Sequence, residues 1–276
     1  MAYPTVQAPY GLKPINLIGG QVFAGSTREY NIPYGYATSI FYGDIVGLTR
    51  GQVARLAVST GTVGTVAGVF LGCSYTDPTT KQKVFAQYWP ASTTAGDAVA
   101  IVCDDPDTVF KAAVCSATTV IASGARAMIG QNLAMIDNTG SITTGNSANA
   151  ILAPSDTPAT TDSLPLRVLG VVPDTAVTLG TATYSSINSA TVTCSALPFA
   201  LPVGTDVGSL AANGQYISSG SFVDTAASAG ATSFVLNQAP ITAFAASATL
   251  VFVQYPELLV KLNFGQHEYY AATATA

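Results

Sequence analysis

Short apolar runs separated by turn residues are the main pattern along the 276-residue chain. They are rich in β-branched and aromatic side chains and bounded by Gly, Pro, Asp or Asn, which is typical of strands in a sandwich or barrel. The predicted strands include residues 38–42 (TSIFY), 68–71 (GVFL), 84–89 (VFAQYW), 98–103 (AVAIVC) and 166–172 (LRVLGVV). The pattern predicts an all-β fold: a β-barrel or β-sandwich main domain with a smaller inserted β-domain.

A change in composition divides the chain near residue 175. The following segment, rich in Ala, Thr, Ser and Val, has an alternating run at 190–195 (ATVTCS) and a hairpin signal at Asn213-Gly214. Residues 258–264 alternate as a closing strand would. The expected parts are an extended arm at 1–14, a main β-domain from 15–175 plus 255–270, an inserted β-domain at 176–254 and a flexible tail at 271–276. A second domain appended after the first, with a free tail, is the alternative.

Charged residues make up only 9% of the chain, against roughly 25% in an ordinary soluble domain. The longest apolar run, 241–253, has 13 residues and follows Pro240, whereas a transmembrane helix needs about 20. The N-terminus does not have the pattern of a secretory signal. We therefore expect no membrane partner, and a surface of small residues that is buried against other proteins. A secreted or bacterial-surface β-protein is the alternative.

Charge and cysteine patterns exclude further classes of partner. The net charge is −5 and the ten basic residues are scattered, so no patch is expected to bind nucleic acid. The four cysteines form no CxxC motif, have no histidine nearby and lie among apolar residues. We expect them to be reduced, buried hydrophobes rather than zinc ligands.

Candidate chemistry is sparse. The chain has one histidine, His267, and lacks the G-x-S-x-G, G-x-G-x-x-G and P-loop motifs. Asp104, Asp105 and Asp107 crowd one segment, where they are expected to form a turn, with a Ca²⁺ site as the alternative. The sequence predicts no catalytic residue, no cofactor and no metal site.

The tyrosines gather near the two ends of the chain, where they suit a protein interface. Residues 1–14 contain three prolines and are expected to lie across a neighbouring subunit or partner. The predicted protein-contact residues are Tyr3, Pro4, Tyr10, Leu12, His267, Tyr269 and Tyr270. Deleting residues 1–10 is then expected to weaken binding and leave the β-fold intact.

Several blocks of the chain resemble structural proteins of tailed-phage virions. They are residues 8–14 (APYGLKP), 34–46 (YGYATSIFYGDIV), 68–93 (GVFLGCSYTDPTTKQKVFAQYWPAST), 98–110 (AVAIVCDDPDTVF), 201–207 (LPVGTDV), 229–237 (AGATSFVLN) and 256–269 (PELLVKLNFGQHEY). The chain is similar to capsid decoration, or cement, proteins. The resemblance implies a non-enzymatic homotrimer that assembles in the host cytoplasm and binds the major capsid protein on the outside of the shell, bridging neighbouring capsomers.

Two other functions agree with the same pattern. One is a tail, baseplate or fibre-type accessory of the virion. The other is a carbohydrate-binding β-sandwich in which Trp89 and tyrosines stack on sugars.

Overall fold

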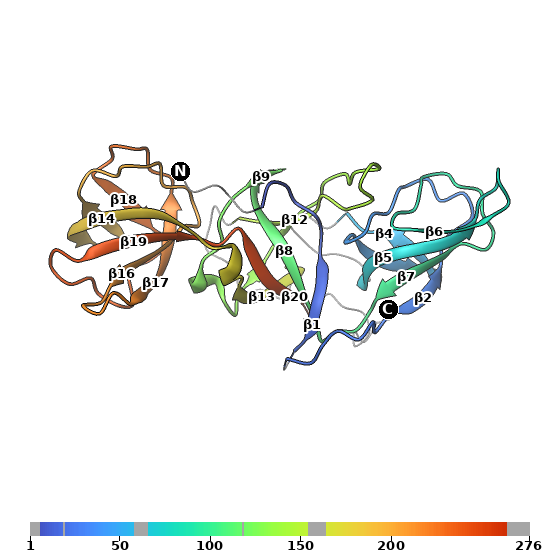
Figure 1. The fold of residues 1–276 in the computed structure, drawn as a ribbon, viewed down its shortest axis with the longest axis horizontal. Helices are drawn as coiled ribbons and strands as arrows, with labels where there is room; N and C mark the ends of the chain where they lie inside the picture. The colour runs from blue at the N-terminus through green and yellow to red at the C-terminus, as the bar shows by residue number, and fades with distance from the viewer. Residues whose placement is uncertain (1–5, 19, 58–65, 118, 154–163, 264–276) are drawn as a thin grey trace, which may run out of the picture.

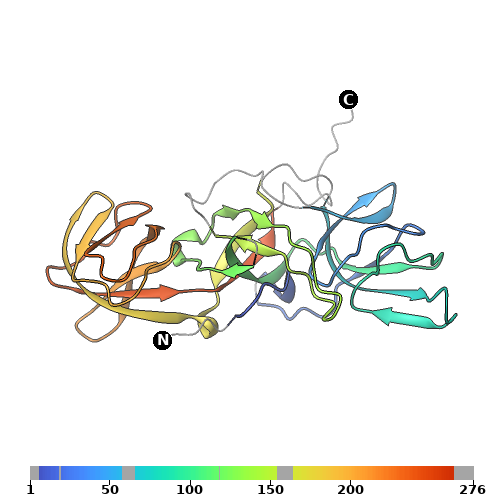
Figure 2. The ribbon, with the colours of Figure 1, turned by 90° about the horizontal axis from the view of Figure 1, so that it is seen from above.

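A computed structural model describes residues 6–18, 20–57, 66–117, 119–153 and 164–263 of the chain. Within these ranges the protein consists of twenty strands and two short 3-10 helices, which confirms the prediction of an all-β fold. The strands form three units that lie in a row, as two perpendicular views show (Figures 1 and 2). None of the described helices is long and apolar enough to cross a membrane.

The first unit is a sheet in the order β2-β7-β5-β3-β4, with β6 also paired to β5. Its strands are β2 (Arg28–Asn31), β3 (Ile45–Thr49), β4 (Gln52–Arg55), β5 (Val66–Thr76), β6 (Lys83–Ala86) and β7 (Val99–Cys103). The predicted strand at 38–42 is instead reduced to two isolated bridges, Ile40 with Trp89 and Tyr42 with Asn146. The first unit has a hydrophobic core of its own around Phe70 and Trp89, both of which are fully buried.

The central unit is a sheet in the order β10-β13-β20-β8-β12-β11, and β1 and β9 also pair with β8. Its elements are β1 (Lys13–Leu17), β8 (Thr108–Ala117), β9 (Val120–Ile121), η1 (Arg126–Met128), β10 (Asn132–Leu133), β11 (Met135–Ile136), β12 (Ala150–Leu152), β13 (Leu166–Val171) and β20 (Glu257–Leu262). The predicted closing strand is β20, in which Leu258, Val260 and Leu262 are buried on one face. Burial does not alternate along it, because Glu257 and Lys261 on the other face are buried as well.

The third unit is a closed barrel in the order β14-β15-β18-β17-β16-β19. Its strands are β14 (Val177–Asn188), β15 (Thr191–Cys194), β16 (Asp206–Leu210), β17 (Tyr216–Thr225), β18 (Ser233–Leu236) and β19 (Thr249–Gln254), and η2 (Pro173–Thr175) leads into it. The predicted turn at Asn213-Gly214 joins β16 to β17, with Gly214 at φ +79°. The barrel is inserted between β13 and β20, which pair with each other in the central sheet.

A shared hydrophobic core joins the three units. The core of the central unit includes Ile45 and Val69 from the first unit and Phe222 and Val253 from the barrel. The segment predicted as the main domain therefore supplies both the first and the central units, and residues 176–254 supply the barrel. Packing through a common core favours one stiff, elongated body, because apolar side chains from neighbouring units fill the same space.

The barrel approaches the central unit closely at Gly204. A Cβ atom built on Gly204 would lie 2.1 Å from the carbonyl oxygen of Ser123, and the backbone there has φ +79°. Both the conformation and the space therefore require glycine at this position. The close approach fixes the loop before β16 against the central unit.

Candidate contact surface

The N-terminal segment lies against its own chain. The backbone nitrogen of Gly11 donates to the Asn149 carbonyl at 3.0 Å, and that of Leu12 donates to the Gly43 carbonyl at 3.0 Å. Leu12 is fully buried in the shared core. This corrects the expectation that Leu12 contacts a partner, because the protein's own core already encloses its side chain. The other predicted contact residues at the two ends, Tyr3, Pro4, His267, Tyr269 and Tyr270, lie outside the described residues.

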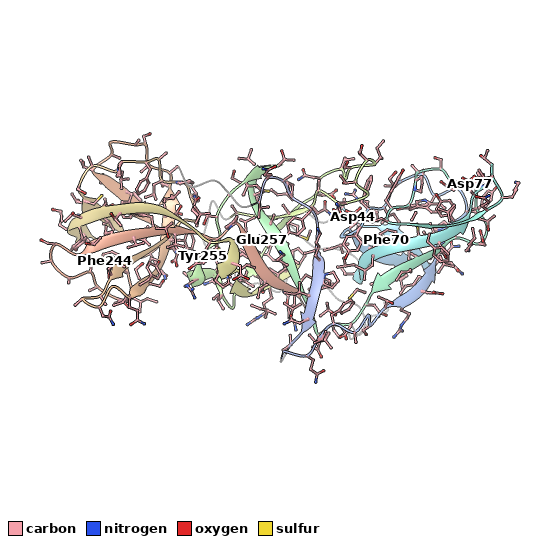
Figure 3. The ribbon with its side chains drawn as sticks, viewed as in Figure 1. Asp44, Phe70, Asp77, Phe244, Tyr255 and Glu257 are labelled. Carbon is pink, nitrogen blue, oxygen red and sulfur yellow. The ribbon has the colours of Figure 1, made fainter. Side chains whose placement is uncertain are left out.

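Tyr10 is half-buried, and its phenol donates a hydrogen bond to the carboxylate of Glu257 on β20. Lys111 Nζ lies 3.4 Å from Glu257 Oε1, and Lys13 Nζ lies 4.6 Å from the centre of the Tyr10 ring. Burial, together with the hydrogen bond to Glu257 and its charge, raises the pKa of Tyr10, which therefore remains a neutral donor. The segment is thus tied to the central sheet through one aromatic side chain (Figure 3 labels Glu257).

A second buried carboxylate, Asp44, ties residues 137–149 to the first unit. Arg55 Nε lies 3.0 Å from Asp44 Oδ2, and the Arg55 guanidinium also pairs with Asp137. The other Asp44 oxygen accepts hydrogen bonds from the Ser147 hydroxyl and, at 3.2 Å, from the Asn149 amide. Burial raises the pKa of Asp44 even though Arg55 and these hydrogen bonds favour the charged form. The network holds the loop in one position.

A third buried carboxylate, Asp206, lies in the barrel where it meets the central unit. The Tyr216 hydroxyl donates to Asp206 Oδ2 at 3.1 Å, and Ser218 Oγ donates to Oδ1 at 3.4 Å. Desolvation raises the pKa of Asp206 to about 6, against the opposing effect of these bonds and of Arg126 on η1. Arg126 Nε in turn donates to the Tyr255 hydroxyl at 3.0 Å.

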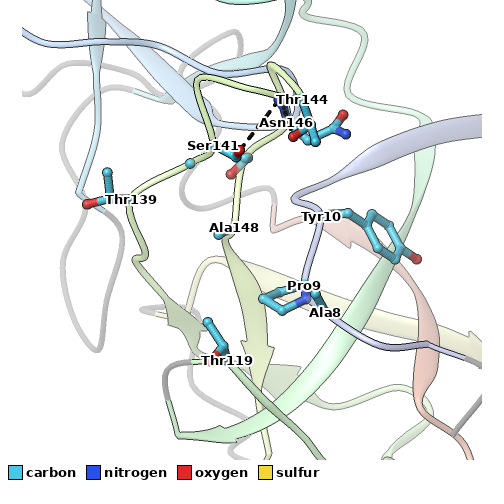
Figure 4. Close-up of a pocket in the computed structure, with 11 residues that line it drawn as sticks. Ala8, Pro9, Tyr10, Thr119, Thr139, Ser141, Thr144, Asn146 and Ala148 are labelled. Atoms are coloured by element: carbon cyan, nitrogen blue, oxygen red, sulfur yellow. Dashed lines mark hydrogen bonds between the residues drawn. The ribbon is translucent and has the colours of Figure 1, made fainter.

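A surface groove of about 400 Å³ lies between the N-terminal segment and the loop that Asp44 holds. Its lining comes from three parts of the chain, residues 8–10, Thr119 and residues 139–148, and contains no charged side chain. The lining residues are Ala8, Pro9, Tyr10, Thr119, Thr139, Gly140, Ser141, Thr144, Asn146, Ser147 and Ala148. Figure 4 shows Pro9 and Ala8 on one side of this groove, and Ser141, Thr144 and Asn146 gathered on another. The Tyr10 ring points away from the other labelled residues, in agreement with its bond to Glu257.

Backbone hydrogen bonds fix the polar side chains of the groove. The Ser141 hydroxyl oxygen accepts from the Thr144 backbone nitrogen at 3.4 Å, and the Thr144 hydroxyl accepts from the Asn146 nitrogen at 3.3 Å. Asn146 Oδ1 accepts from the Gln87 amide at 2.8 Å. The side-chain oxygens of Ser141, Thr144 and Asn146 therefore accept hydrogen bonds from within the protein. Their O–H and N–H groups remain able to donate to a ligand.

The acidic segment after β7 is a turn whose carboxylates have separate partners. Asp104 pairs with Arg28 at 3.0 Å and accepts a hydrogen bond from the Tyr30 hydroxyl, while Asp105 accepts from the backbone nitrogen of Asp107. In the part of the chain that the structure describes, no group of three or more His, Cys, Asp or Glu side chains could hold a metal ion.

Trp89 and the cysteines belong to the interior. Trp89 is fully buried and meets Tyr75 edge-on, with ring centres 5.2 Å apart, so it offers no face to a sugar. This excludes the predicted stacking role for Trp89. Cys73, Cys103, Cys115 and Cys194 are buried free thiols whose pKa values are raised by burial. Their thiols are therefore poor nucleophiles.

Large apolar side chains are exposed on each of the outer units. Phe85 on β6 and Ile241 in the loop before β19 are each 80% exposed, and Ile142 beside the groove is 69% exposed. At the barrel, Tyr184, Ile187, Pro240 and Phe244 line a hollow of about 160 Å³, and the rings of Tyr184 and Phe244 lie 5.3 Å apart (Figure 3 labels Phe244). Single exposed apolar side chains are common on protein surfaces, so these residues offer apolar surface at separate places and do not form one patch.

Comparison with known proteins gives no relative: no protein-family model, no curated protein and no solved structure matches the chain.

Proposed function

We propose that this chain is a structural, non-enzymatic protein of a tailed-phage virion that binds the outer surface of the capsid and bridges neighbouring capsomers. The observation that carries the proposal is the core shared by the three units, which makes an elongated body of one piece. A bridge between capsomers has to reach two binding sites without bending between them. The likeness of several sequence blocks to decoration proteins supports the same function.

The surface supports a role in protein contact. Phe85 and Ile241 are strongly exposed in units at opposite ends of the row, so apolar contacts are available at two separated places (Figure 1). The low charge of the chain reduces the desolvation penalty of burying the rest of its surface. In a trimer, three such bodies would engage the capsid together, and modest single contacts would add up to tight attachment.

The contacts of Tyr10 require a shorter deletion than residues 1–10 to test the N-terminal arm. Removing residues 1–10 also removes Tyr10, which leaves the Glu257 carboxylate without its phenol partner and weakens the fold itself. Removing residues 1–5 alone leaves every described contact in place. If those five residues bind the capsid, this shorter deletion weakens binding to purified shells and leaves the thermal unfolding midpoint unchanged.

The copy number in purified particles decides between the virion functions. Quantitative mass spectrometry of particles from the phage that encodes the chain should find hundreds of copies for a decoration protein. A handful of copies per particle would place it in the tail or baseplate. Absence from particles would refute a virion function.

A further inference from the structure

We propose that the groove between residues 8–10 and 139–148 binds a neutral saccharide. This goes beyond attachment to a capsid, since it gives the chain a second ligand on a surface formed by its own residues. The volume of about 400 Å³ lies within the range of small-ligand sites and is enough for one or two sugar rings.

The lining selects for a neutral, polyhydroxylated ligand. The groove presents the hydroxyl groups of Thr119, Thr139, Ser141 and Thr144 and the amide of Asn146, with no charged side chain among its lining residues. A hydroxyl can donate and accept at once, so it can pair with another hydroxyl in either direction. A phosphate or carboxylate ligand would find no cation here to balance its charge.

The other side of the groove is apolar. Pro9 and Ala8 present hydrocarbon surface on one side, and Ala148 lies between them and the hydroxyl groups of Ser141 and Thr144 (Figure 4). A sugar ring also has a polar rim and an apolar face of C–H groups, so the groove matches it on both sides. The stacking surface is then the proline ring, since Trp89 is buried and the Tyr10 ring is turned toward Glu257.

The groove is held in shape before any ligand arrives. Ser147, at its base, donates to the buried Asp44 carboxylate, and Gly11 N bonds to the Asn149 carbonyl. The Ser141–Asn146 turn is closed by two backbone hydrogen bonds, of 2.9 Å and 2.8 Å. Binding therefore requires little ordering of the protein, which improves the affinity of a small site.

The test is a glycan array probed with the purified full-length chain displayed on streptavidin tetramers, because tetravalent display compensates for a weak single site. The array carries neutral bacterial oligosaccharides beside sulfated and sialylated ones. We expect retention on neutral glycans. No retention, or retention only on the charged glycans, overturns the proposal.

Variants then locate the site. Thr139 is exposed, and none of the hydrogen bonds within the described structure uses its hydroxyl, so Thr139→Ala removes a ligand contact and leaves the fold intact. We expect its Kd for the best neutral glycan, measured by titration calorimetry, to be about three- to tenfold weaker, the effect of one hydrogen bond. Ala148→Trp fills the groove and should abolish binding. Thr193→Ala, at an exposed threonine on the barrel, is the matched control and should bind normally.

Circular dichroism spectra of all three variants, compared with that of the wild type, verify that each variant keeps the fold. Binding that survives both Thr139→Ala and Ala148→Trp places the ligand elsewhere and overturns the assignment. If a proline-rich peptide is bound and no glycan is, the groove is a peptide site and the proposal fails.

Discussion

Replacing Asp206 by asparagine removes a buried charge from the junction between the barrel and the central unit. Asp206 is fully buried on β16, and its carboxylate accepts hydrogen bonds from the hydroxyl groups of Tyr216 and Ser218. The Val207 backbone and the charge of Arg126 also favour its ionised form. Asparagine has nearly the same shape and keeps one oxygen to accept the Tyr216 hydrogen bond. Its amide group can donate to the Ser218 hydroxyl, which accepts as well as donates. The change therefore affects charge and leaves packing almost unaltered.

The expected effect follows from the pKa of Asp206, which folding raises from 3.8 to about 6. A raised carboxyl pKa stabilises the fold fully below pH 3.8, and this stabilisation is lost as the pH rises through about 6. At 1.36 kcal/mol for each pKa unit, the wild type loses about 3 kcal/mol of unfolding free energy from this group between pH values well below 3.8 and pH 8, and about 2.4 kcal/mol of this is lost between pH 4 and pH 7. Asparagine does not titrate. Allowing about 1 kcal/mol for a weaker hydrogen bond, we expect the variant to be about 2 kcal/mol more stable than the wild type at pH 8.

The assay is urea denaturation followed by far-ultraviolet circular dichroism at half-unit steps from pH 4 to pH 8. The useful quantity is the difference in unfolding free energy between the variant and the wild type, because other titrating groups cancel from it. The difference should rise with pH and level off above pH 7. Asp224→Asn, at the other carboxylate of the barrel, controls for the loss of one negative charge. A difference that stays flat with pH, or a variant less stable than the wild type at pH 8, would refute the reasoning.

Three further substitutions test the junctions and the core by thermal and urea unfolding. Gly204→Ala forces a Cβ against the Ser123 carbonyl in a left-handed conformation and should cost at least about 1–3 kcal/mol; an unchanged midpoint contradicts that close approach. Tyr10→Phe leaves the buried Glu257 carboxylate without its phenol donor and should cost about 1–3 kcal/mol, and a smaller effect would mean that water replaces the phenol. Trp89→Ala should cost about 3–5 kcal/mol, and a surface-like effect below about 0.5 kcal/mol would contradict its burial.

The strands were predictable wherever an apolar run was long enough to be buried on its own. β5, β6, β7, β13 and β15 all fall within or overlap runs that the sequence marks. Residues 38–42 have the same composition but form only isolated bridges. Their backbone bonds to separate partners: Ile40 pairs with Trp89, the Phe41 carbonyl accepts from Asp44, and Tyr42 pairs with residues 145 and 147. Composition cannot show which backbone partners lie nearby.

The groove was hidden from sequence reasoning because neither of its two sides is informative alone. Residues 8–10 look like part of an extended arm, and residues 139–148 (TGSITTGNSA) look like an ordinary polar loop. They are joined by the hydrogen bond from the Gly11 nitrogen to the Asn149 carbonyl, and the Asp44 carboxylate holds Ser147 and Asn149 in place. Asp44 lies far from both segments in the sequence, and no motif distinguishes it from the other carboxylates. Leu12 was misjudged for a related reason, since an apolar residue beside prolines suits an arm as well as a core. The hydrogen bonds of Gly11 to Asn149 and of Leu12 to Gly43 show that Leu12 belongs to the core.

The pairing of β20 with β13 and β8 sets the order in which the chain can fold during synthesis. β20 is the last of the described strands, and the edges of β13 and β8 that pair with it have no partner until residues 257–262 have left the ribosome. The barrel needs only residues 177–254, so it can close first and bring the two ends of its insertion together. A nascent chain halted before residue 257 should then hold a protease-resistant barrel beside an unfinished central sheet. Pairing of β20 with β13 and β8 completes the described central sheet. The release of residues 257–262 from the ribosome is then the step after which the three units can pack around their shared core.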